Sequence, residues 1–262
     1  MNRIAAFFRI TVGVVLLCFF TGQLCGGDRD LDKSYRKAAN RFGFVIKCEP
    51  KFNRVIQGVA LPVEMVEPEL NLFFEALEEL GESFVKKSGL SRVIICSNLT
   101  LHGNPCGGVA AGNTIYLSKG FSKKTVYHEM FHVFDKHNND KDWLSCNHKR
   151  FIYRGIDFKD KPVSKKLRKK LEKNNSKYNI DFSGDFVSDY AQSNESEDRA
   201  ETFSYMIANS KTVWQKAQKS RALRMKMQYI VQMTSRNSLL GKEYWVRKFG
   251  SEIMNKNFVG KE

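Results

Sequence analysis

Large apolar side chains recur every three or four positions through residues 67–87, the spacing of one face of an amphipathic helix. Six of them form this stripe: Leu70, Phe73, Phe74, Leu77, Leu80 and Phe84. The same spacing returns in residues 213–233 and 242–253. These segments are therefore predicted to be helices, and the chain beyond residue 201 is predicted to be mostly helical.

A different spacing marks the predicted strands, which all precede residue 119. Residues 42–48 and 92–97 are short apolar runs, the second of them rich in β-branched residues and bounded by turn residues. A Gly-rich stretch, residues 103–112, reads as turns. After it, Ile115 and Leu117 alternate with their neighbours in residues 113–118, as in a strand with one buried face. Strands followed by helices predict an α+β protein.

The most specific pattern lies inside the apolar run of residues 126–134, where His128, Glu129 and His132 form a His-Glu-x-x-His motif. Positions four apart share one helix face, so both imidazoles can reach a single Zn²⁺ while the glutamate points at its water. That is the geometry of a zinc hydrolase. The motif is short, and two histidines satisfied within an apolar core are the alternative.

A third ligand is needed, because catalytic zinc usually takes three protein side chains and one open position. His137 follows His132 by five residues, which turns it about 140° around the helix and away from the metal. A metzincin would have Gly and His where this chain has Asp135 and Asn138, so that class is excluded. Cys106 could suggest a cysteine ligand of the deformylase kind. Its Asn-Pro-Cys-Gly-Gly setting is more economically explained as a turn that carries a structural cysteine.

A better candidate for the third ligand lies about 65 residues downstream. Glu197 and Glu201 are four apart and share a helix face beside an apolar stripe. The stripe consists of Ala200, Phe203 and Ile207. Ser193 or Asn194 can cap this helix. The two glutamates could instead belong to a solvated helix face. Next to a His-Glu-x-x-His helix, however, a second helix presenting a glutamate is what a gluzincin site requires.

In these residues the chain resembles the family of the anthrax lethal factor catalytic domain and related secreted gluzincin endopeptidases. The similarity covers roughly residues 107–210. It rests on two motifs in order, His-Glu-x-x-His and then Tyr190, Asn194 and a Glu-x-x-Ala-Glu-x-Phe run that begins at Glu197. The resemblance implies a metalloprotease with one zinc ion. Residues 141–181 have no counterpart in it, so it leaves the choice of substrate open.

The resemblance also implies a role for each matching residue. The implied zinc ligands are His128, His132 and Glu197. Glu129 becomes the general base, Tyr190 a hydroxyl donor to the developing oxyanion, and Glu201 a residue that supports a ligand. Spacing alone adds Asp135, seven residues after the first histidine, which could accept a hydrogen bond from a ligand imidazole. An ordinary aspartate on the helix surface explains that position equally well.

The chain is predicted to contain one folded domain behind a targeting segment. Residues 1–27 combine two arginines, a short apolar core and small residues, which favours a secretory signal peptide over an N-terminal anchor. Residues 28–262 are then an α+β, zincin-like metalloprotease domain. Its small mixed sheet is expected to have residues 113–118 as the edge strand beside the His-Glu-x-x-His helix, available to an extended peptide.

Cysteine content adds an expectation about redox state. Four cysteines follow the targeting segment: Cys48, Cys96, Cys106 and Cys146. In a secreted, periplasmic or cell-surface protein they predict two disulfides, with three possible connectivities. No Cys-x-x-Cys spacing occurs among them, which argues against a structural zinc cluster.

The formal net charge is +15, and residues 159–177 form a lysine-rich run. Such a field favours an acidic partner, although a solvated loop or helix face is the more ordinary interpretation. Nucleic-acid binding is not expected, because no recognition motif occurs and aromatic residues are not interleaved with the basic run. Nor is stable membrane insertion expected once a signal peptide is cleaved. The expected partner is a polypeptide substrate, with an acidic one favoured by the charge; the oligomeric state is left open.

The sequence therefore predicts a secreted zinc endopeptidase. One alternative is a zinc hydrolase that acts on a non-peptide amide, and another is an inactive zincin scaffold that only binds partners. Glu129 and Tyr190 together argue against the inactive scaffold, which has no chemical need for either. An edge strand that can pair with peptide backbone favours the endopeptidase over the other hydrolase.

Overall fold

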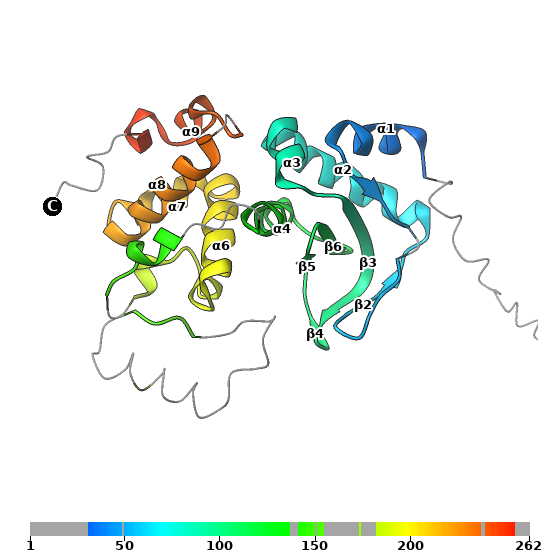
Figure 1. Cartoon of the computed structure of the whole chain (residues 1–262), viewed down its shortest axis with the longest axis horizontal. Coiled ribbons are helices and arrows are strands. Elements are labelled where there is room, and N and C mark those ends of the chain that lie inside the picture. Colours follow the sequence, from blue (N-terminus) through cyan, green and yellow to red (C-terminus); the bar gives the residue numbers. More distant parts are fainter. Residues whose placement is uncertain are drawn as a thin grey trace, which may run out of the picture.

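The computed structural model describes residues 31–48, 50–136, 141–149, 151–154, 173, 182–236 and 239–254. Residues 1–27, predicted as the signal segment, and nearly all of the basic run lie outside the described residues. The described chain has an α+β architecture, with a small sheet and its helices on one side and a group of helices on the other (Figure 1).

The sheet is mixed and is built around one long central strand. β3 (Arg92–Leu101) pairs in parallel with β1 (Val45–Ile46) and with β6 (Thr114–Ser118), which gives the order β1-β3-β6-β5. The second part of β3 pairs antiparallel with β2 (Ile56–Ala60) and β4 (Asn104–Pro105). The predicted β-branched strand is thus the centre of the sheet, where both of its faces can be covered.

The edge strand beside the His-Glu-x-x-His helix is β5 (Gly108–Ala111), not residues 113–118 as predicted. β6 lies inside the sheet, because β3 pairs with one of its sides and β5 with the other. β5 carries the small residues Gly-Val-Ala-Ala and falls in the stretch that reads as turns. Without large alternating side chains it gives no strand signal in the sequence.

Three helices that precede β3 share the main core with one face of the sheet. They are α1 (Lys33–Phe42), α2 (Val63–Leu80) and α3 (Glu82–Ser88). The predicted helix over residues 67–87 is divided at Gly81, which has a φ of 81° and joins α2 to α3. The predicted strand over residues 42–48 shortens to β1, because α1 continues to Phe42 and ends at a left-handed Gly43.

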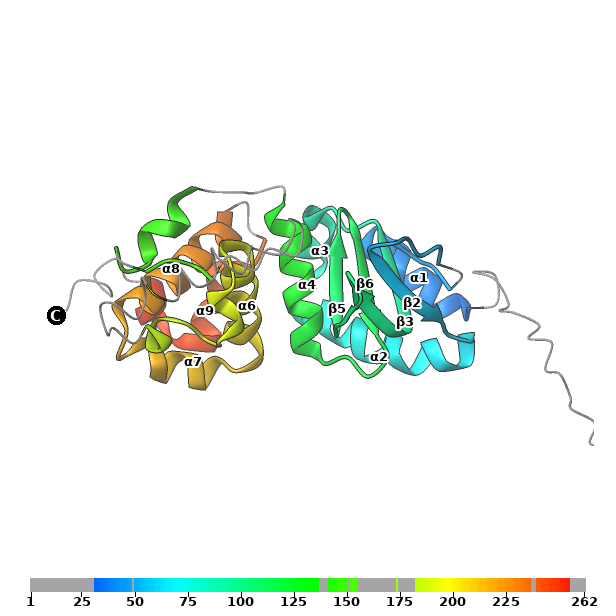
Figure 2. The same ribbon diagram turned by 90° about the horizontal axis from the view of Figure 1, so that it is seen from below.

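Beyond residue 201 the described chain is mostly helical, as predicted, although the predicted helix over residues 213–233 is divided between α7 and α8. α6 (Glu195–Ala208), α7 (Ser210–Ala217), α8 (Arg221–Ser235) and α9 (Lys242–Phe249) pack together, with 3₁₀ turns at Lys141–Cys146, Ser183–Asp185, Tyr190–Gln192 and Ser251–Met254. α4 (Lys123–Asp135) lies between the sheet and α6 (Figure 2). Among the described residues, no helix is long and apolar enough to cross a membrane.

Aromatic rings from both sides of the molecule meet around α4. Phe203 of α6 lies with its ring centroid 4.6 Å from that of Phe131 on α4 and 5.5 Å from that of Phe84 on α3. Trp245 of α9 extends the cluster at 6.3 Å from Phe203. Aromatic pairs at these separations add to the free energy gained by burial. The core is therefore continuous from the sheet helices to the C-terminal helices, and it fixes α6 against α4.

The predicted disulfides are absent among the described residues, because no disulfide joins Cys48, Cys96, Cys106 or Cys146. Two of these thiols donate to backbone carbonyls instead, Cys96 to Leu117 and Cys106 to Leu99. Burial raises the pKa of Cys96 and of Cys106 to about 11, so both thiols stay protonated near neutral pH.

Candidate metal centre

The histidines and Glu129 lie in the middle of α4, on a buried part of that helix. Ser122 caps α4, and its hydroxyl accepts the Thr125 backbone N–H at 3.2 Å. The apolar residues of α4 fill the main core, while its polar positions lie between α6 and β5. His128 and Glu129 are both buried there. Buried polar side chains require partners, and α6 and β5 supply them.

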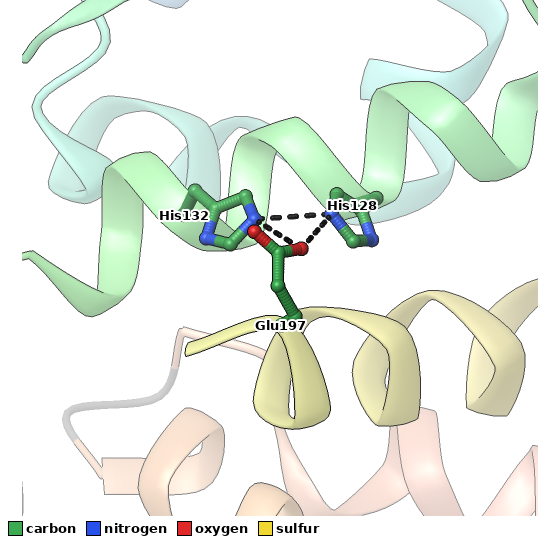
Figure 3. Close-up of side chains that lie close together, drawn as sticks. All are labelled: His128, His132 and Glu197. Carbon is green, nitrogen blue, oxygen red and sulfur yellow. Dashed lines mark hydrogen bonds and ion pairs between the residues drawn. The ribbon is translucent and has the colours of Figure 1, made fainter. Parts of the chain in front are cut away.

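The start of α6 places Glu197 opposite the two histidines. Asn194, one of the two predicted caps, is the N-cap residue, and its side-chain oxygen accepts the Glu197 backbone N–H at 2.9 Å. The Glu197 Oε2 atom lies 3.0 Å from His128 Nε2 and 3.2 Å from His132 Nε2 (Figure 3). The two Nε2 atoms are 3.0 Å apart. Three side chains thus converge on one point from two helices.

The donor set and its spacing fit a zinc ion. The candidate ligand atoms of His128, His132 and Glu197 all lie within 4.8 Å of one another. Atoms bound at zinc's usual N and O distances in a tetrahedron would be about 3.3 Å apart, close to the 3.0–3.2 Å observed. Two imidazole nitrogens and a carboxylate are also among the ligands that zinc prefers.

The charges at this point are those of a cation site. Burial disfavours a proton on His128, but hydrogen bonds to Glu197 and Glu201 outweigh it and raise the pKa of His128 to about 10. Burial would raise the pKa of Glu197, yet the charge of His132 and the bonds to both histidines hold it well below its ordinary value. The carboxylates therefore hold positive charge between the two helices.

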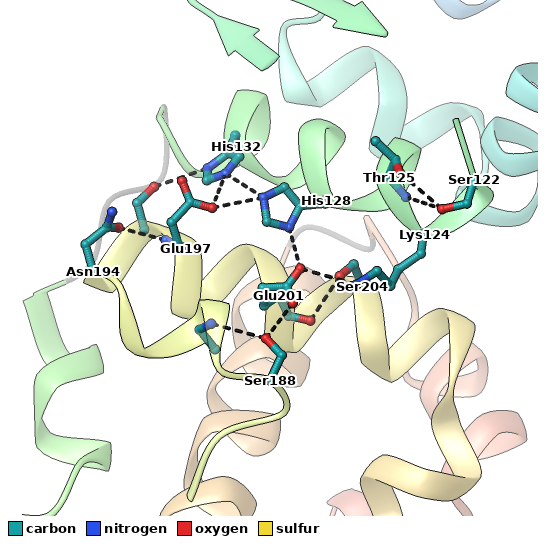
Figure 4. Close-up of polar contacts among 12 residues, drawn as sticks. Ser122, Lys124, Thr125, His128, His132, Ser188, Asn194, Glu197, Glu201 and Ser204 are labelled. Carbon is teal, nitrogen blue, oxygen red and sulfur yellow. Dashed lines mark hydrogen bonds and ion pairs between the residues drawn. The ribbon is translucent and has the colours of Figure 1, made fainter. Parts of the chain in front are cut away.

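The outer nitrogens of both imidazoles also have partners on α6 (Figure 4). His128 Nδ1 lies 3.0 Å from Glu201 Oε1, and His132 Nδ1 lies 3.2 Å from Ser196 Oγ. Such contacts orient a ligand imidazole and leave its other nitrogen for a metal. The sequence indicated Glu201 through its spacing from Glu197. Ser196 gave no signal, because a serine in the first turn of a helix is common.

Glu129 is 5% exposed and lies under the edge strand. The Ala110 backbone N–H of β5 donates to its carboxylate, and an added Cβ on Gly108 would lie 2.8 Å from Glu129 Oε1. Burial raises the pKa of Glu129 above its ordinary value, against the opposing charges of the two histidines. The small residues of β5 therefore leave room for a carboxyl group that can hold a proton.

Tyr190 lies on the open side of the centre, in the 3₁₀ turn before α6. Its ring centroid is 6.1 Å from that of His128, and its hydroxyl hydrogen-bonds Glu197. Tyr190 is 39% exposed. Partial burial and the nearby carboxylates, Glu197 foremost, raise the pKa of Tyr190, so its hydroxyl remains a donor across the neutral range.

Asp135 lies apart from the imidazoles, and the suggested hydrogen bond to one of them is absent among the described residues. Its Oδ2 accepts from Arg199 Nε at 2.8 Å, in a pair that is almost fully buried. Two turns of α4 separate Asp135 from His128, about 10 Å along the axis. Spacing along the chain could not identify this partner, because Arg199 lies on α6. The ion pair holds α4 against α6.

Residues 112–258 match the model of a family described as "Putative zinc-binding metallo-peptidase". The chain belongs to this family. The match includes α4 and α6, and so every residue of the centre from His128 to Glu201. The family match supports a zinc-binding metallopeptidase. It does not distinguish the lethal factor family from other zinc metallopeptidases.

No curated protein matches the chain. A solved structure from Bacteroides caccae ATCC 43185, which carries the same description as the family, is similar over 86% of this chain and 96% of its own. Its sequence identity with this chain is 15% and its TM-score is 0.47.

Proposed function

We propose that this metallopeptidase is a gluzincin-type zinc endopeptidase in which His128, His132 and Glu197 hold one zinc ion. The observation that carries the proposal is the convergence of these three ligand atoms within 4.8 Å, from α4 and α6. The resemblance to lethal factor supports the same set of residues. When bound, zinc supplies Lewis acidity and lowers the pKa of a coordinated water towards ~7.

The remaining residues carry out proton transfer and stabilise charge. Glu129 accepts the proton of the attacking water and passes it to the leaving amine. Its raised pKa suits this exchange, because a general base works best when its pKa approaches the working pH. Tyr190 donates its hydroxyl hydrogen to the oxyanion that develops on the scissile carbonyl. Tyr190 is partly exposed, so a bound substrate can reach its hydroxyl from solvent.

A polypeptide substrate is supported by the family and by the position of β5. This strand pairs only with β6 among the described residues, so its other side presents backbone groups beside Glu129. An extended peptide can add to such an edge. A non-peptide amide would not use the strand in this way. The basic charge of the chain favours acidic segments in the substrate.

Secretion is part of the proposal and is supported by the sequence pattern of residues 1–27. The mature protein is expected to begin between residues 22 and 28. Intact mass of the protein recovered from its native compartment measures this directly. If the recovered protein has the mass of the full-length chain, residues 1–27 are an uncleaved N-terminal anchor and not a signal peptide.

The test of the activity compares wild type with Glu129→Gln. A complex proteome is digested with each protein, and the new N-terminal peptides are profiled. Wild type is expected to generate a defined set of new termini. Glu129→Gln should bind zinc and unfold at the same temperature as wild type, yet generate none, because glutamine cannot accept the proton of the water. Equal cleavage by both proteins would show that Glu129 is not the general base.

A further inference from the structure

Ser188 lies two residues before Tyr190, outside both sequence motifs, and its hydroxyl makes two hydrogen bonds. The Ser188 Oγ–H donates to Glu201 Oε2 at 2.6 Å (Figure 4). The same oxygen accepts the Ala191 backbone N–H at 3.1 Å. One side chain therefore joins the loop that precedes α6 to a carboxylate near the middle of α6.

The two oxygens of Glu201 have different partners. Oε1 faces His128 Nδ1 at 3.0 Å, with Lys124 Nζ 3.6 Å away, and Oε2 accepts from Ser188. A carboxylate held through both oxygens cannot rotate, so its Oε1 stays in line with the imidazole. Without the serine hydroxyl, Glu201 would be held only through Oε1 and could turn towards the partly exposed ammonium of Lys124.

The bond to Ala191 acts on the other side of the centre. Tyr190 begins a 3₁₀ turn of three residues, which is too short to hold its own geometry by intrahelical bonds. The Ser188 hydroxyl satisfies the Ala191 N–H in the middle of that turn. The backbone of the residue after Tyr190 is thus fixed by the oxygen that also orients Glu201.

We propose that Ser188 is a positioning residue that orients His128 through Glu201 and places the Tyr190 hydroxyl through the 3₁₀ turn. This inference rests on the proposed function, because it assigns Ser188 to the support of a zinc ligand and of an oxyanion donor. It predicts that one hydroxyl affects two properties that are otherwise separate. These are the affinity for zinc and the turnover of zinc-loaded protein.

Three substitutions separate the hydroxyl from its surroundings. Ser188→Ala removes both hydrogen bonds, and Ser188→Thr keeps a hydroxyl. Ser188→Cys keeps the size but offers only a weak donor, and it serves if the alanine variant does not fold. The matched control is Ser204→Ala. The Ser204 hydroxyl is buried on α6, the helix of Glu201, and donates at 3.0 Å to the backbone carbonyl of Glu201 rather than to its carboxylate.

Zinc affinity is measured by competition with a chelator, and kcat and KM on zinc-saturated protein with a peptide found by terminal profiling. Ser188→Ala and Ser188→Cys are expected to bind zinc roughly 10-fold more weakly, within the range for lost ligand support. Their kcat should fall about 10-fold with KM changed less than about twofold. Ser188→Thr should recover most of both losses, and Ser204→Ala should alter thermal stability alone.

The outcomes separate this inference from the proposed function. If Ser188→Ala or Ser188→Cys keeps the wild-type zinc affinity and kcat while its Tm falls, Ser188 is structural only and the inference is overturned. The same holds if Ser204→Ala weakens zinc binding as much as Ser188→Ala does. A wild-type chain that binds no zinc overturns the proposed function, and the inference with it.

Discussion

The three glutamates nearest the histidines differ in their surroundings, and this difference separates their roles. Glu197 and Glu201 each accept from an imidazole of α4, which holds the pKa of both carboxyls below the ordinary value despite burial. Glu129 has no such bond, and burial raises its pKa. Groups whose environments shift their pKa values in opposite directions can act as ionised ligand and as proton acceptor at one pH.

Zinc binding is predicted to release about one proton per ion at pH 7. In the absence of metal the pKa of His128 is about 10, so its imidazole is protonated at neutral pH and must lose that proton to coordinate zinc. Zinc affinity should accordingly fall as the pH is lowered. Titration calorimetry in two buffers of different ionisation enthalpy measures the release. Identical binding enthalpies in the two buffers would show that His128 is already neutral.

Tyr190→Phe is predicted to lower kcat roughly 100-fold with little change in KM, because it removes one donor that acts mainly in the transition state. Zinc content should remain normal, since Tyr190 is not among the three converging ligands. Kinetics, zinc occupancy and thermal stability are measured on one preparation. A stability loss of about 1 kcal/mol with unchanged kcat would make Tyr190 a structural residue.

At the scale of elements, the contact between β5 and α4 decides the position of Glu129. A Cβ on Gly108 would lie 2.8 Å from Glu129 Cγ, whereas a Cβ on the adjacent Gly107 would have its nearest neighbour at 3.8 Å. Gly108→Ala is therefore predicted to displace Glu129 and lower kcat by roughly 10- to 100-fold while zinc still binds. Gly107→Ala should leave kcat near wild type. Equal effects of the two substitutions would mean that the strand, rather than Glu129, had moved.

At the scale of the whole molecule, a buried ion pair holds α6, the helix that carries Glu197, against α8. Lys226 of α8 is fully buried, and its Nζ lies 2.9 Å from Asp198 Oδ2 on α6. Trp143 and Tyr153 donate to the same oxygen at 3.0 and 2.7 Å. Burial lowers the pKa of Lys226 and raises that of Asp198. The pair joins three separate segments next to a candidate ligand.

Lys226→Met is predicted to lower the free energy of unfolding by about 3–5 kcal/mol, because it leaves Asp198 buried without its counter-ion. The double variant Lys226→Met with Asp198→Asn should recover part of that loss, since no charge is then left unpaired. Urea denaturation of zinc-free protein measures both. A single variant as stable as wild type would show that Asp198 is neutralised by its other partners.

The sequence by itself determined the features that depend on residues within a few positions of one another. The period of apolar residues determined the helical C-terminal half, and the two motifs set His128, Glu129, His132 and Glu197 on helix faces. Their roles in zinc binding and catalysis remain predictions. A helix places residues three and four apart on one face whatever surrounds it, so such patterns can be read locally.

Tertiary structure decided the features that depend on pairing between distant segments. β5 became the edge strand because β6 pairs with β3, and Asp135 paired with Arg199 because α6 packs against α4. No disulfide joins the four described cysteines, although Cys96 and Cys106 lie in the same small core cluster. The turn before α6 brings the Ser188 hydroxyl to the carboxylate of Glu201. Local sequence cannot specify these contacts, because each is set by the packing of the whole core.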